Sequence, residues 1–170
     1  MENSLSAIPW NTIGLWREAN TCLARTISND DSALADCRRQ ARQARRLLES
    51  LFPLMDALCR RTCPDCTNIC CRRAWVWVDF RDLLFFHLAG IPVPDRQLVS
   101  ERGDHCRYAG SAGCRLDRLQ RPFVCTWYIC PAQTRLLENR SKEKRGLSSA
   151  LEQIKNLRKQ MESAFIRVVV

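Results

Sequence analysis

Three segments of the chain place apolar residues at helical spacing. The first follows Pro9, a residue that favours the first turn of a helix, and has apolar side chains at Trp10, Ile13, Trp16, Leu23 and Ile27. The second repeats apolar or small residues in alternating steps of three and four at Leu34, Cys37, Ala41, Ala44, Leu48, Leu51, Met55 and Leu58. The third begins at Ser148 and carries Leu151, Ile154, Leu157, Met161, Phe165 and Val168. These spacings predict three amphipathic helices.

Polar residues and a proline set the expected limits of the second helix. Asp30 and Asp31 supply an N-terminal cap and a favourable charge. Pro53 lies inside the apolar repeat, where a proline removes one backbone hydrogen bond and clashes with the preceding turn. We therefore expect a kink or a break near Phe52, which would turn residues 54–61 toward the cysteine-rich part of the chain.

Shorter elements are predicted around the cysteines. Residues 75–78 alternate large and β-branched side chains and predict a short extended segment. Asp79 is a suitable cap for a helix from about Phe80 to Ala89, which Gly90 would end.

Glycine and proline predict the form of the next part of the chain. Residues 110–113, Gly-Ser-Ala-Gly, predict a turn that returns Cys114 toward Cys106. Pro131 suits a first helical turn, so residues 132–139 are expected to be helical. The charged stretch 141–146 is expected to be a solvated break before the last helix.

The predicted fold is therefore mainly α, a helical single domain over residues 1–170 with a Cys-rich metal-binding loop region. No apolar run reaches the ~20 residues that would span a bilayer, and the longest, residues 83–91, is interrupted by His87. The first residues lack a basic stretch followed by an apolar one, so we expect no secretory leader. A cytoplasmic protein with no membrane partner is the expectation.

Eight of the eleven cysteines crowd into two blocks within residues 63–131. The first block is Cys63, Cys66, Cys70 and Cys71, and the second is Cys106, Cys114, Cys125 and Cys130. Thiols in short local spacings that meet from two segments are typical of zinc or iron–sulfur sites. A disulfide framework is the alternative, but it needs an oxidising compartment, and an odd number of cysteines leaves one thiol over. All eight are candidate metal ligands, whether in one centre or two.

Other cysteines and the histidines are weaker candidates. Cys22 and Cys37 lie in helical patterns and are expected to be buried core thiols, whereas Cys59 is left open. His105, beside Cys106, is more often a loop side chain than a ligand, and His87 is expected in or near the core. Because Cys70 and Cys71 are adjacent, their side chains point apart, and one of them should serve a different site.

Arginines accompany the cysteines in sequence. Arg72 and Arg107 each follow a candidate ligand, and Arg121 precedes Cys125 by four residues. Guanidinium groups can offset the negative charge of a thiolate cluster and donate to sulfur, so these three are candidate cofactor-binding residues. The alternative is that they are solvated surface charges.

The formal net charge of +9 raises the question of nucleic-acid binding. One basic surface is predicted on the second helix, and Lys155, Arg158 and Lys159 form another on the last. The first of these surfaces comprises Arg38, Arg39, Arg42, Arg45 and Arg46. However, thiolates at a metal site would cancel part of the charge, and no Cys2His2 finger or other base-reading motif is present. Nucleic-acid binding with a structural or redox-sensing metal site is thus the alternative function.

The cysteine pattern resembles the YkgJ-type cysteine cluster family, a zinc- or iron-chelating domain partly related to flagellin lysine-N-methylases. The resemblance lies in Cys63-x2-Cys66 followed by Cys70-Cys71, in Cys106 followed by Gly113-Cys114, and in Arg121-Pro122-x2-Cys125-x4-Cys130. The chain departs from the family in the spacing after the second cysteine, in Cys114-x10-Cys125 and at Thr126. The resemblance implies a metal-chelating function and leaves the metal open.

No catalytic residue can be assigned from the sequence. It lacks a P-loop, a Gly-rich dinucleotide turn and a Gly-x-Ser-x-Gly elbow, although Asp65, Asp79 and Asp104 lie near candidate ligands. The expected function is a Cys-ligated metal-binding protein, with redox or metal-dependent modification chemistry and a protein partner left open. An iron–sulfur cluster is slightly favoured over Zn²⁺, because ferredoxin-type ligand runs end in Cys-Pro, as in Cys130-Pro131.

Overall fold

A computed structural model describes residues 8–64, 66–67, 70, 76–111 and 113–170. Within these ranges the protein is mainly helical, as the sequence predicts. The helices are α1 (Ile13–Asn29), α2 (Ala35–Thr62), α4 (Phe80–Ala89), α5 (Val124–Trp127), α6 (Pro131–Glu138) and α7 (Ser141–Val169). A short antiparallel hairpin joins β1 (Ala109–Gly110) to β2 (Gly113–Cys114), and a 3-10 turn, η1, spans Arg118–Gln120.

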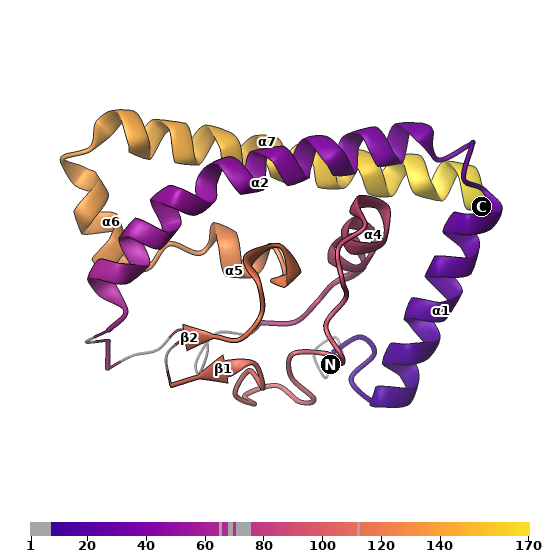
Figure 1. Ribbon diagram of the computed structural model, residues 1–170, viewed down its shortest axis with the longest axis horizontal. Coiled ribbons are helices and arrows are strands. Elements are labelled where there is room, and N and C mark those ends of the chain that lie inside the picture. Colours follow the sequence, from indigo (N-terminus) through magenta and orange to yellow (C-terminus); the bar gives the residue numbers. More distant parts are fainter. Residues whose placement is uncertain (1–7, 65, 68–69, 71–75, 112) are drawn as a thin grey trace, which may run out of the picture.

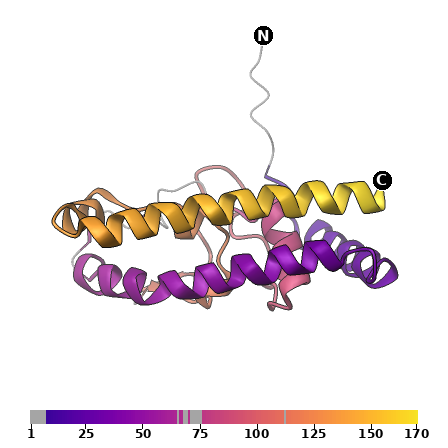
Figure 2. The same cartoon turned by 90° about the horizontal axis from the view of Figure 1, so that it is seen from above.

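The two longest helices form one layer of the molecule. α2 and α7 run side by side in opposite directions, and α6 joins α7 near the end of α2 (Figures 1 and 2). Below this layer in Figure 1 lie α4, α5 and the hairpin, with α1 at the far end. The apolar face of α2 is buried as the repeat predicts, and Ile154 and Met161 of α7 are almost fully covered. The long pair therefore covers the part of the chain that holds the cysteines.

α4 is the most deeply buried of the shorter helices. Its predicted limits are confirmed, because Asp79 accepts from the backbone of Asp82 in a capping box and Gly90 ends the helix in the left-handed region at φ 64°. Residues 83–86 are all buried, so α4 packs against α2, α7 and α1 on several sides. Apolar residues around the whole helix explain why its sequence shows little amphipathic pattern.

The first helix begins three residues later than its apolar pattern predicts. Thr12 is its N-cap and accepts a hydrogen bond from the backbone of Leu15. Trp10 has φ 51°, outside the helical region, and therefore cannot extend the helix toward Pro9. Trp16 is buried and donates its indole N–H to the carbonyl of Pro94 at 2.9 Å, which fixes α1 against the loop after α4.

The predicted start of the second helix is wrong, and of the kink or break expected near Phe52 the break does not occur. Asp30 caps the C-terminus of α1, and α2 begins at Ala35 after one turn. The helix then continues through Pro53 to Thr62, because the packing of its apolar face outweighs one lost hydrogen bond. Figure 1 shows its axis curving toward the hairpin in the second half. The end of α2 therefore still comes near the cysteine-rich loops.

The solvated break predicted over residues 141–146 is also wrong. α7 starts at Ser141 and includes Gly146 without interruption. Arg140, just before the helix, pairs with Glu143 at 2.7 Å and supports the first turn. Lysine, glutamate and arginine are good helix formers, and one glycine costs only about 1 kcal/mol, so the helix does not stop.

The remaining local predictions have mixed outcomes. Residues 76–78 form no regular strand, while Trp75 lies outside the described residues. The helix after Cys130 is confirmed, with Pro131 in its first turn. The turn at residues 110–113 is confirmed as the hairpin, with Ala109 paired to Cys114 and Gly113 at φ 114°. No helix among the described residues has the length and apolar character needed to cross a membrane.

Candidate metal centre

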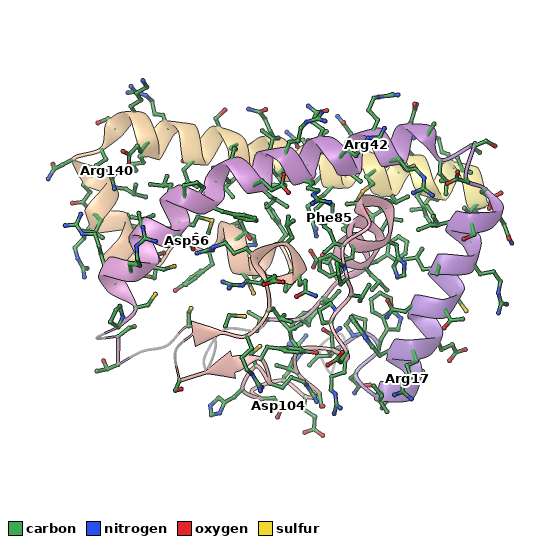
Figure 3. All side chains as sticks on the ribbon, in the orientation of Figure 1. Arg17, Arg42, Asp56, Phe85, Asp104 and Arg140 are labelled. Atoms are coloured by element: carbon green, nitrogen blue, oxygen red, sulfur yellow. The ribbon has the colours of Figure 1, made fainter. Side chains whose placement is uncertain are left out.

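Ten cysteines lie in the described part of the chain, and no disulfide joins any two of them there. Cys71 and Arg72, both predicted site residues, lie outside it. The other predicted ligands fall into two neighbourhoods. Figure 3 shows sulfur atoms around the hairpin and at the end of α2.

The first neighbourhood holds Cys106, Cys114 and Cys125, which we call the hairpin thiols. They come from the loop before β1, from β2 and from α5, and they are close enough that Cys106 and Cys114 raise the pKa of Cys125. The hairpin returns Cys114 toward Cys106, as predicted, because Gly113 adopts a positive φ. Three segments of the second block therefore meet.

Backbone N–H groups are directed at the Cys106 sulfur. The side chain is buried, and burial raises its pKa, while hydrogen bonds from the backbone N–H of Tyr108 and Ala109 lower it. The chain turns tightly here, because Ala109 N–H also donates to the Cys106 carbonyl at 3.0 Å. Donors to sulfur two and three residues ahead stabilise the thiolate form that binds metals.

Cys125 is held by the loop that leads into α5. Its backbone N–H donates to the carbonyl of Pro122 at 2.9 Å, and the N–H of Phe123 donates to Asp82 Oδ1 at 2.9 Å. Burial strongly raises the pKa of Cys125, and the neighbouring thiols and Asp82 raise it further. A thiolate at this position thus requires a compensating positive charge.

Two predicted arginines lie beside the hairpin thiols. Arg107 donates to Ser100 Oγ and lowers the pKa of Cys106, while Arg121 lowers that of Cys125 and donates from Nε to the Leu116 carbonyl at 3.0 Å. Arg107 Nε is buried, and the described residues provide no hydrogen-bond acceptor for it. Both guanidinium groups are therefore placed to offset negative charge at the thiols.

The second neighbourhood holds Cys59, Cys63 and Cys70, which we call the helix-end thiols. Cys59 lies in the last turn of α2, and Cys63 is the C-cap, whose backbone N–H donates to the Cys59 carbonyl at 2.8 Å. Desolvation and then the Cys59 thiol raise the pKa of Cys63, and Cys70 adds a smaller effect of the same sign. Cys66 is half-buried and tied back by its N–H to the Cys63 carbonyl at 3.2 Å.

Gln133 links the helix-end thiols to Cys130. Its amide Nε2 donates to Cys59 Sγ at 3.5 Å, and its Oε1 accepts from the Cys130 backbone N–H at 3.4 Å. The Cys130 sulfur in turn accepts from the Gln133 backbone N–H at the start of α6. Sequence reasoning missed Gln133 and left Cys59 open. The four-residue step from Cys59 to Cys63 at a helix end was the available signal.

Of the two predicted core thiols, one is confirmed and one is wrong. Cys37 is buried, as expected, and donates to the Met161 carbonyl at 3.8 Å, whereas Cys22 is exposed and not a core residue. His105 is exposed beside Cys106. His87 is half-buried, with Nε2 2.9 Å from Asn20 Oδ1, and burial lowers its pKa.

The predicted basic surfaces are largely ion-paired or buried. On α2, Arg38 pairs with Asp31, Arg39 with Asp36 at 2.8 Å and Arg45 with Glu49 at 2.9 Å, so three of the five arginines there face carboxylates. On α7, Arg158 does not belong to a solvated surface, because it is only 6% exposed and pairs with acidic residues of α4 and its cap. Both surfaces carry less free positive charge than the sequence indicates.

Within the ranges that the structure describes, no three His, Cys, Asp or Glu side chains already stand as a group that could hold a metal ion. The two neighbourhoods are thus sets of adjacent thiols and not complete cages. Comparison with protein-family models, curated proteins and solved structures found no match for this chain.

Proposed function

We propose that the protein binds a metal centre through cysteine thiolates, with an iron–sulfur cluster slightly favoured over Zn²⁺. The observation that carries the proposal is the hairpin, which pairs Ala109 with Cys114 and so returns Cys114 toward Cys106. Two backbone N–H groups are directed at the Cys106 sulfur, and Cys125 lies near enough for both thiols to raise its pKa beyond the effect of burial. The resemblance of residues 63–131 to the YkgJ-type family supports the same function.

The donor set around the hairpin fits a thiophilic metal. Burial raises the pKa of both Cys106 and Cys125, so neither thiolate is favoured by its surroundings without added positive charge. A metal ion or cluster supplies that charge and displaces the thiol protons, which makes binding dependent on pH. Thiolate-rich sets select zinc or iron–sulfur clusters over hard cations such as Mg²⁺.

The surroundings of the thiols fit a centre that carries negative charge. A divalent ion with four thiolates has a net charge of about −2. The guanidinium groups of Arg107 and Arg121 lie beside Cys106 and Cys125, and the buried Nε–H of Arg107 has no acceptor in the described part of the chain. A thiolate sulfur is an acceptor suited to such a donor.

Ligands beyond the three hairpin thiols would come from the first block. Cys66 and Cys71 are the candidates there, while Cys63, Cys70 and Cys130, the rest of the predicted set, belong to the neighbourhood at the end of α2. An iron–sulfur cluster would supply one-electron transfer, and zinc would supply structural stability. The chain's own residues orient the thiols, offset their charge and exclude water from Cys106.

The test compares cysteine variants with a matched thiol variant elsewhere. Cys106→Ser and Cys125→Ser should each lose the metal and destabilise the protein, because binding energy at such sites is also folding energy. Cys22→Ser, which removes an exposed thiol of α1, should keep both metal and stability. Full metal content and unchanged melting in Cys106→Ser and Cys125→Ser would refute the proposal.

The identity of the metal is tested on anaerobically purified protein. A cluster predicts a brown protein with iron and acid-labile sulfide in comparable amounts. Zinc predicts a colourless protein with no sulfide.

A further inference from the structure

We infer that the end of α2 carries a second metal-binding site, separate from the hairpin centre, in which Cys59 binds a thiophilic ion. Cys63, one helical turn further on, would be the second ligand, and Cys70 and Cys130 would complete the set. The inference rests on the metal chemistry of the proposed function and adds Cys59, a thiol that the hairpin centre does not use. Cys59 lies outside the two cysteine blocks and outside the motif that resembles the YkgJ-type family.

Cys59 and Cys63 have the spacing of a ligand pair. They lie one helical turn apart, at i and i+4, so their side chains share one face of the end of α2. Paired ligands at this spacing bind one ion in helical metal sites. Here the Cys63 N–H donates to the Cys59 carbonyl at 2.8 Å, so the helical geometry that sets this spacing extends to both residues.

Two side-chain N–H groups donate to the Cys59 sulfur. Gln133 Nε2 approaches it at 3.5 Å and Arg118 Nη2 at 3.8 Å. Arg118 is itself fixed, because its Nε donates to Asp56 Oδ1 at 2.7 Å and its guanidinium lies over the Phe52 ring. Two side-chain N–H groups, one of them charged, therefore point to the Cys59 sulfur, which is the arrangement expected around a metal-binding thiol.

The amide of Gln133 also positions Cys130. Gln133 is buried, and it uses its two amide atoms to connect Cys59 in α2 with the backbone of Cys130 at the start of α6. This is the arrangement of an outer residue that orients ligands from two elements. Cys70, seven residues after Cys63, would complete the set.

Local charge explains why a cation would belong at this place. Thiolates at the C-terminal end of a helix are opposed by the negative end of the helix dipole. Arg118 supplies one positive charge within the neighbourhood, and a divalent ion would supply the rest. A simple packed thiol would need neither the charged donor nor the buried amide.

The experiment counts metal ions in the full-length chain purified anaerobically from a medium supplemented with Co²⁺. Total cobalt, zinc and iron per chain are measured, together with the absorption of thiolate-bound cobalt. Cys59→Ala should hold one ion fewer than the wild type and keep the hairpin centre. Cys106→Ala should lose the hairpin centre and keep the ion at Cys59, while Cys22→Ala should match the wild type.

The two proposals fail differently in this experiment. If Cys59→Ala holds as much metal as Cys22→Ala, the second site is refuted and the hairpin centre stands. If Cys59→Ala loses metal and Cys106→Ala does not, the hairpin centre is refuted and the second site stands. A wild-type chain without metal refutes both.

A second variant covers the case in which Cys59→Ala does not fold. Gln133→Leu keeps the volume of the buried side chain and removes its amide, so Co²⁺ should still bind but about 10- to 100-fold more weakly at this site. An unchanged affinity would overturn the role of Gln133 in orienting the ligands. A disulfide between Cys59 and Cys63, seen as two missing thiols in denatured, unreduced protein, would overturn the site itself.

Discussion

Arg158 of α7 and Asp82 of α4 form a buried ion pair, in which Arg158 Nη1 donates to Asp82 Oδ1 at 2.6 Å. The two side chains are only 7% and 5% exposed. The same guanidinium reaches Asp79 Oδ1 at 3.1 Å through Nη2, and Asp82 also accepts from the backbone N–H of Phe123. The pair therefore joins α7, α4 and the loop that holds Cys125.

Replacing Arg158 by Met should lower the free energy of unfolding by about 3–5 kcal/mol, because it leaves the Asp82 carboxylate buried without its partner. Lys155→Met is the matched control on the same helix. Lys155 is exposed and pairs with Glu152 at 3.4 Å, so its loss should cost no more than about 1 kcal/mol. Urea unfolding of both variants tests this, and equal small losses would contradict it.

The stability of the protein should depend on the ionisation of Asp82. Burial raises the pKa of Asp82 to about 6, since it outweighs the attraction of Arg158, and the negative charge of Asp79 adds to the rise. A carboxyl whose folded pKa lies above its unfolded value stabilises the fold at low pH. That contribution is lost as the pH rises through the folded value.

We expect the stability difference between the wild type and Asp82→Asn to shrink between about pH 4 and pH 7. The slope should not exceed about 1.4 kcal/mol per pH unit, the limit for one proton. Chemical unfolding of both proteins across this range measures the difference. A difference that grows with pH would show that Arg158 holds the pKa of Asp82 below its ordinary value.

Two glycines should respond to alanine in opposite directions. Gly90 ends α4 at φ 64°, where a side chain is strained, so Gly90→Ala should destabilise the protein by about 1 kcal/mol. Gly146 lies within α7, and an added Cβ would meet no atom of the described residues within 4 Å. Gly146→Ala should therefore stabilise by up to about 1 kcal/mol. Thermal unfolding of the two variants gives the signs directly.

Nucleic-acid binding should be weak at physiological salt. Arg38, Arg39 and Arg45 face carboxylates, and Arg158 is buried, which removes four of the arginines that the sequence assigns to basic surfaces. Binding to an arbitrary duplex and single strand at two salt concentrations is the measurement. Submicromolar, salt-sensitive binding that Arg38→Gln with Arg45→Gln weakens would favour the alternative function.

Local signals in the sequence determine most of the helices. The three- and four-residue steps of α2 identify its buried face from Cys37 to Leu58, and Asp79 with Gly90 fixes both ends of α4. These features depend on residues within one helical turn of each other, so they can be predicted from the sequence. The glycines at 110 and 113 likewise predict the turn that brings Cys114 back.

Where local signals fail, long-range packing decides. Pro53 and Gly146 both predict interruptions, yet α2 and α7 continue through them because each helix buries its apolar face along the other. Arg158 has the sequence context of a solvated charge and is instead buried against Asp82. The continuity of these helices and the burial of Arg158 both depend on residues more than one helical turn away in sequence.

The candidate site, like the fold, could be predicted from the sequence only in part. The sequence by itself determined that cysteines are concentrated in residues 63–131 and which eight of them are candidate ligands. Only the tertiary structure decided that Cys106, Cys114 and Cys125 are neighbours. It also decided that the Gln133 amide donates to the sulfur of Cys59, one helical turn before Cys63. Cys106, Cys114 and Cys125 are only 8 and 11 positions apart, but a turn and a short helix must form between them. Cys59 and Gln133 are 74 positions apart, and the packing of α6 against α2 makes them neighbours.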